Sequence, residues 1–245
     1  MRRGGSAVAG VLAFAAIWEL LGRWHAFGAT WPPLSAVLLY LGQPEHRAVL
    51  LAAVRQTGTE ALVGLGAGTF AGIALASVAT IVPLAAPGLT ALAGIVNGIP
   101  IIAVAGVCVL TLPRDTTPSV VAALAAAFIV FVGAAAALRD SRAELRDLFS
   151  VLGASRPATF WRLDVPSALP SILDAVRSAA PASVVGAILG EWFAAERGLG
   201  PLLVASMQNY AITELWGVAL IGAAFSMVLY ALLGVFRAAL LARLS

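Results

Sequence analysis

Long stretches with few or no charged residues recur along the chain. A helix that crosses a membrane needs about 20 consecutive, mostly apolar residues. Six stretches approach or exceed that length: Ser6–Leu21, Ala61–Val82, Gly88–Leu112, Pro118–Leu138, Ile172–Phe193 and Trp216–Leu241. They predict an all-α polytopic membrane protein with about six transmembrane helices. Because 245 residues then leave no room for a large soluble domain, residues 1–245 are expected to form a single transmembrane domain.

The composition excludes several other classes of protein. Hydrophobic residues make up 61% of the chain and charged residues 11%. In soluble domains roughly half of the residues are hydrophobic and about a quarter are charged. One cysteine, Cys108, and two separated histidines, His25 and His46, predict no disulfide framework and no metal site. All of the basic residues are arginine, so the chain lacks the lysine that an ATP-binding P-loop requires. The arginines form no basic patch of the kind that binds nucleic acids.

The distribution of arginines predicts the orientation, because short cytoplasmic loops carry the excess of positive charge. Five arginines lie between the fourth and fifth predicted spans, within residues 139–171. This segment is therefore expected in the cytoplasm, as are the N-terminus and the C-terminus. An alternative for the first stretch is a secretory signal peptide, but Trp18 and Glu19 follow the weak cleavage site where small residues are expected.

The segment 139–171 has a local pattern of its own. Residues 144–152 can form a helix, Gly153 permits a turn, and Ser155 can cap a second helix that has Pro157 in its first turn. Apolar side chains between the charges are what a helix docked on another protein would need, and a solvated loop with local salt bridges is the alternative. The apolar side chains are those of Leu148, Phe149, Leu152, Phe160, Trp161 and Leu163.

This spacing resembles the E-A-A-x3-G-x9-I-x-L-P signature of the membrane subunits of bacterial binding-protein-dependent ABC importers. Asp147 stands at the glutamate, Gly153 at the glycine, Leu163 and Val165 at the isoleucine and leucine, and Pro166 at the proline. The two alanines are replaced by Leu148 and Phe149. The resemblance implies a cytoplasmic coupling helix that docks into an ATPase subunit, and its contact residues would include Ala154 and Ser155 beside the glycine.

Other pieces are similar to the branch of these permeases that serves nitrate, sulfonate, taurine and bicarbonate. They are Ile17-Trp18-Glu19, Trp31 to Val37, Gly98 to Ala103, and Glu191 with Gly198-Leu199-Gly200. The resemblance implies a permease homodimer in the bacterial inner membrane, with ATP and Mg bound by separate ATPase subunits and solute delivered by an extracytoplasmic binding protein. It favours small oxyanions as substrates. Similar permeases serve pyrimidine or thiamine precursors, riboflavin and other aromatic compounds, which is the alternative.

Polar and helix-breaking residues inside the spans are candidates for the translocation path, because polar groups are costly in lipid unless they face water or a partner. Asn97 lies next to Gly98 and Pro100, where the helix is interrupted. Glu191 ends the fifth predicted span; it could form a gate, contact the binding protein, pair with Arg197 or cap the following loop. The spans contain no arginine cluster that would mark an anion site.

Glycines recur every fourth residue at 64, 68 and 72, and Ala182, Gly186 and Gly190 follow the same spacing. Each set lines one helix face and predicts close helix contact. Two rival functions stay open at this level. An ion-driven carrier would need an intramembrane relay of ionisable groups, which the span centres lack. A membrane scaffold would use the charged segment only to recruit a partner.

Overall fold

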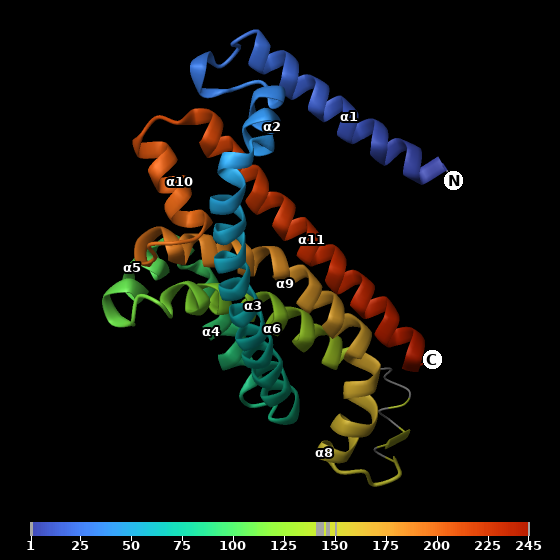
Figure 1. Ribbon diagram of the computed structural model, residues 1–245. Helices are drawn as coiled ribbons and strands as arrows, with labels where there is room; N and C mark the ends of the chain where they lie inside the picture. Colours follow the sequence, from blue (N-terminus) through green and yellow to red (C-terminus); the bar gives the residue numbers. More distant parts are fainter. Residues whose placement is uncertain (1, 141–144, 146–147, 150, 245) are drawn as a thin grey trace.

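The computed structural model describes the chain except residues 1, 141–144, 146–147, 150 and 245 (Figure 1). The described residues form helices and turns without a strand. The helices are α1 (Arg2–Arg23), α2 (Leu34–Gly42), α3 (Pro44–Ile81), α4 (Ala86–Gly98), α5 (Ile101–Thr111), α6 (Thr117–Arg139), α8 (Arg156–Thr159), α9 (Val165–Ala194), α10 (Leu199–Gln208) and α11 (Ile212–Leu244). A 3₁₀ turn, η1 (Gly28–Thr30), precedes α2, and a π-helical turn, η2 (Phe160–Asp164), joins α8 to α9.

The prediction of an all-helical polytopic membrane protein is confirmed. Within the described residues, four helices are long and apolar enough to cross a membrane: Pro44–Ile81, Thr117–Arg139, Arg156–Ala194 and Ile212–Arg243. The bent pair α4 and α5 would make a fifth crossing. Helix α1 occupies the first predicted stretch and stands away from the other helices along most of its length (Figure 1).

The stretch Gly88–Leu112 is expected as one span interrupted near Pro100, and the structure divides it into two helices. Helices α4 and α5 meet at an angle of 91°. Pro100 has no N–H to continue the helix, and it pushes the preceding Ile99 into an extended conformation (φ −78°, ψ 126°). The break therefore follows from two adjacent residues, and it places Asn97 in the last turn of α4, next to the bend.

Helix α6 lies between α3 and α9 at the centre of the bundle, and small residues allow this packing. A Cβ atom at Gly64 or Gly72 of α3 would lie within 3.0 Å of backbone atoms of α6. A Cβ atom at Gly186 of α9 would lie 2.8 Å from the Cα atom of Ala122, a residue of α6 that a Cβ atom at Gly64 would also meet. The predicted close contact at both glycine faces is confirmed, and the structure identifies α6 as the shared partner.

The first pieces of the sequence resemblance pack against one another. The indole N–H of Trp18 donates to the Pro32 carbonyl at 3.0 Å, and the Glu19 carboxylate accepts bonds from the Ser35 N–H and hydroxyl, each at 2.8 Å. The Trp216 ring of α11 lies 5.0 Å from the Trp18 ring between centroids. These contacts hold the end of α1 to the start of α2 and to α11.

Candidate functional site

The turn of the predicted coupling segment is built around Gly153. Its φ is +71°, in the left-handed region that glycine adopts without strain. The Ala154 N–H donates to the Phe149 carbonyl at 2.9 Å, which is the hydrogen bond of a helix that ends on a glycine in this conformation. Ser155 then begins α8 by accepting the Ala158 N–H with its hydroxyl oxygen at 3.4 Å. The expected turn and cap are present, and Asp147 lies outside the described residues.

The apolar side chains of this segment divide into two groups. Val151, Leu152 and Trp161 are 85%, 72% and 68% exposed. Phe160 and Leu163, which the sequence analysis placed with the outward contacts, are buried at 4% and 5% exposure, and Phe160 packs into a core formed by helices of its own chain. Val165 packs beside the same core, and Pro166 is exposed in the first turn of α9.

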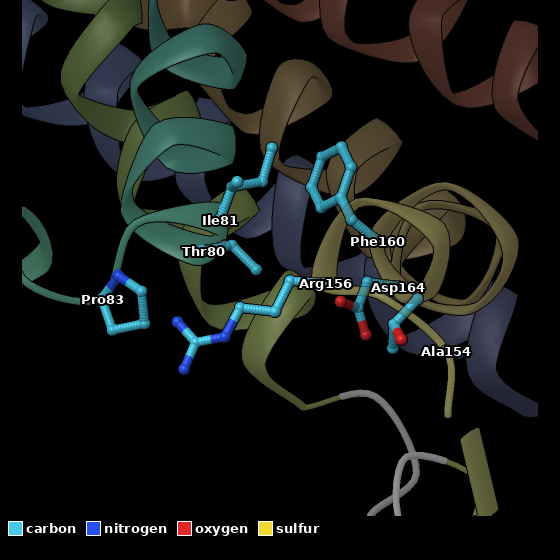
Figure 2. Close-up of a pocket in the computed structure, with 8 residues that line it drawn as sticks. Thr80, Ile81, Pro83, Ala154, Arg156, Phe160 and Asp164 are labelled. Carbon is cyan, nitrogen blue, oxygen red and sulfur yellow. The ribbon is translucent and has the colours of Figure 1, made fainter. Parts of the chain in front are cut away.

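A pocket of about 350 Å³ separates this segment from the end of α3 (Figure 2). Thr80, Ile81 and Pro83 line one side. Residues of the segment line the other: Ala154, Arg156, Thr159, Phe160 and Asp164. Figure 2 shows the Arg156 side chain reaching across toward the α3 side.

A second cavity, of about 370 Å³, opens at the break between α4 and α5. Asn97 and Pro100, the candidates for the translocation path, line it together with Phe128 and Ile129 of α6 and Ala182 of α9. The other lining residues are glycine, alanine and aliphatic residues, and none of the lining residues is charged. The amide of Asn97 is thus the polar side chain in an otherwise apolar wall.

Glu191 lies elsewhere, at the far end of α9, and is fully buried. One carboxylate oxygen accepts the Thr57 hydroxyl at 2.6 Å, and the other accepts the Gly200 N–H at 2.8 Å. Thr57 in turn accepts the Leu199 N–H at 2.9 Å. Of the four roles considered for Glu191, the structure shows the capping of the following loop, and it adds a tie to α3 through Thr57.

The glycines of the Glu191 motif follow from this arrangement. Gly198 has a φ of +126°, and a Cβ atom there would collide with the Glu191 carboxylate. A Cβ atom at Gly200 would lie 2.6 Å from the Ile188 carbonyl oxygen and 2.7 Å from the Glu191 Cβ atom. The glycines at positions 198 and 200 therefore allow the start of α10 to pack against the buried Glu191 carboxylate.

Thr57 is the residue that sequence reasoning missed, and it provides a test of this cluster. We expect Thr57→Val to lower the thermal unfolding midpoint in detergent, because it leaves the Leu199 N–H without its acceptor and removes a donor from Glu191. Each buried polar group left unpaired costs about 1–3 kcal/mol. Thr57→Ser keeps the hydroxyl and should stay near wild type. Equal midpoints for the two variants would show that only packing matters at this position.

The chain matches a known family, two named transport permeases and a solved structure. A model of the binding-protein-dependent transport system inner membrane component matches residues 64–245. The formylaminopyrimidine transport permease protein ThiX of Halalkalibacterium halodurans is 39% identical over 103 residues, which cover 42% of this chain and 41% of ThiX. The riboflavin transport system permease protein RibX of Chloroflexus aurantiacus is 30% identical over 108 residues, or 44% of this chain and 40% of RibX.

These matched regions span about two fifths of each relative. The fold is also that of a solved ABC transporter chain. A chain from the MetNI methionine ABC transporter, determined in inward-facing conformations, superposes with a TM-score of 0.72 at 16% identity, covering 80% of this chain and 98% of that one. Because the family model covers most of the sequence, this protein belongs to the binding-protein-dependent transport system inner membrane components, the permease family of ABC importers.

Proposed function

We propose that the chain is the permease subunit of an ATP-driven importer for a planar nitrogen heterocycle of the formylaminopyrimidine or flavin kind. The cavity at the α4–α5 break carries this assignment of substrate class. Its apolar wall, with the Phe128 ring and the single amide of Asn97, suits a flat aromatic molecule with hydrogen-bonding edges. An oxyanion would need a cationic side chain to balance its charge there, and no charged residue lines the cavity. The names of ThiX and RibX point to the same class.

The transport cycle needs partners that this chain does not supply. In the proposal two copies of the chain form the path, and each presents its coupling segment to an ATPase subunit that binds ATP and Mg. The segment includes Asp147, Gly153, Ala154, Ser155, Leu163, Val165 and Pro166. Its exposed members contact the ATPase, and the buried Leu163 and the partly buried Val165 transmit its movement to the bundle. An extracytoplasmic binding protein delivers the solute, and both termini lie in the cytoplasm of an inner-membrane protein.

Reconstituted transport tests the proposal. The chain would be purified in mild detergent with the ATPase and the binding protein that accompany it, and placed in liposomes. We expect uptake of labelled formylaminopyrimidine or riboflavin that requires ATP, and no ATP-dependent uptake of taurine or nitrate. ATP-dependent uptake of an oxyanion alone would overturn the substrate class, and uptake driven by an ion gradient without ATP would overturn the importer.

Asn97→Asp tests the cavity itself. A carboxylate in this wall would have to be desolvated as an apolar ring enters, so we expect uptake to fall by about tenfold, equivalent to ~1.4 kcal/mol. The control is Asn209→Asp, which makes the same change at an exposed position after α10. The initial uptake rate in the same liposomes measures both. A normal rate for Asn97→Asp would place the path away from this cavity.

A further inference from the structure

The Glu191 cluster contains a second carboxyl group that the hydrogen bonds described above do not use. Glu60 of α3 is 7% exposed, and its carboxyl lies within hydrogen-bonding reach of the Glu191 carboxyl. One Glu60 oxygen, Oε1, accepts the Gln56 amide at 2.8 Å. The other, Oε2, is buried and has no hydrogen-bond donor among the described residues.

Counting donors and acceptors shows what is missing. The two carboxyl groups present four oxygens, of which three accept bonds, from Gln56, Thr57 and the Gly200 N–H. Buried carboxylate oxygens normally have a donor, and an ionised carboxyl can supply none. The neighbouring carboxyl can satisfy the fourth oxygen only if one of the two carries a proton. Two adjacent buried carboxylates would in addition repel each other strongly, because little solvent screens them.

We infer that Glu60 and Glu191 share one proton, and that this proton holds the start of α10 closed against α3. The pair then carries a single negative charge, which the Thr57 hydroxyl and the Gly200 N–H stabilise. Loss of the proton would place two negative charges in contact beneath the α9–α10 connection. The tie between α3, α9 and α10 would therefore be strong at low pH and would weaken as the pH rises through release of the proton.

The pair has a route to solvent. A pocket of about 400 Å³ lies over Glu60 and is lined by Gln56 and by four charged residues: Arg114 and Asp115 between α5 and α6, and Glu196 and Arg197 between α9 and α10. Arg55 lines the adjoining pocket. Helix α10 contains no titratable residue, and Glu214 at the start of α11 faces Tyr40 instead. Protons can therefore reach the pair from this side without crossing the bundle.

The opposite ends of α3 carry different functions. Thr57 and Glu60 lie about 30–36 Å along the helix from Ile81 and the coupling pocket, at 1.5 Å per residue. This distance is close to the roughly 30 Å hydrocarbon core of a bilayer. If the coupling segment is cytoplasmic, as the proposed function requires, the proton-sharing pair lies at the outer face, where the pH is that outside the cell.

Glu60→Gln tests the inference, because the amide donates a hydrogen bond to Glu191 at every pH and keeps a single negative charge in the pair. The purified full-length chain would be melted in detergent from mildly acidic to alkaline pH. We expect the wild-type midpoint to fall by several degrees as the pH rises, and the Glu60→Gln midpoint to stay level. The matched control is Glu196→Gln, which removes an exposed carboxylate from the same pocket and should behave as wild type.

Infrared difference spectroscopy gives a second readout that does not depend on stability. Wild type and Glu196→Gln should show the carbonyl stretch of a protonated carboxyl at neutral pH, which disappears on alkalinisation and is absent from Glu60→Gln. If Glu60→Gln does not fold, the inference is tested by whether this band is present in wild type at neutral pH and disappears on alkalinisation. Absence of the band at neutral pH, or identical pH profiles for wild type and Glu60→Gln, would overturn the inference. Neither measurement involves transport, so both stand whether or not the proposed substrate is correct.

Discussion

Gly68→Val is expected to prevent the three central helices from assembling, whereas Gly66→Val, two residues earlier on the same helix, should leave the protein near wild type. A Cβ atom at Gly68 would collide with the Ala123 carbonyl oxygen and lie 2.9 Å from the Ala126 Cβ atom of α6. Most of what it meets is backbone, which cannot rotate away. A Cβ atom at Gly66 would have nothing within 4 Å.

The expected cost of Gly68→Val exceeds the usual 1–3 kcal/mol of an overpacked core, because the collision involves the main chain of the partner helix. The pair of variants is well matched, since both place valine in α3 and share the same helix propensity and apolar character. Yield and monodispersity on size-exclusion chromatography in detergent, followed by thermal unfolding, measure the outcome. A monodisperse Gly68→Val protein with a wild-type midpoint would mean that α3 and α6 do not pack as closely as the structure shows.

The sequence predicted this packing face but not its partner. The spacing of small residues indicates which face of a helix allows close contact, and this is a local property of the sequence. Which helix lies against it is set by the assembly, so the position of α6 between the two faces required the structure. The break at Pro100 is similar: the residue types mark an interruption, but the 91° angle between α4 and α5 depends on what each half packs against.

The Glu191 cluster shows where sequence reasoning ends. Glu191 and the glycines that follow are close in sequence, and the capping role was among the roles considered for them. Thr57 lies 134 residues away in an apolar helix, where an isolated threonine has no distinguishing pattern. The same limit applies to Phe160 and Leu163, because apolar residues in a short charged segment can face a partner or their own core, and the sequence alone does not separate the two.

The Gly153 turn gives the largest expected effect on function without an effect on the bundle. Valine rarely adopts a φ near +71°, and the left-handed conformation costs a side chain roughly 1–2 kcal/mol, more when it is branched at Cβ. A Cβ atom at this position would meet nothing within 4 Å. The substitution therefore changes the preferred backbone of the turn and not the contacts of its neighbours.

We expect Gly153→Val to reduce ATP-driven uptake by about tenfold or more, the equivalent of ~1.4 kcal/mol, while the unfolding midpoint of the bundle stays the same. Gly153→Asn is the control, since asparagine also adds a side chain to this surface but tolerates the left-handed conformation. If the turn positions the segment for the ATPase, valine causes this loss of coupling and asparagine retains most of it. Equal losses in both variants would indicate that the ATPase contacts the glycine surface itself, and normal uptake with valine would remove this turn from the coupling path. The ratio of ATP hydrolysed to solute imported, measured in the same liposomes, separates a failure of coupling from a failure of the permease to transport.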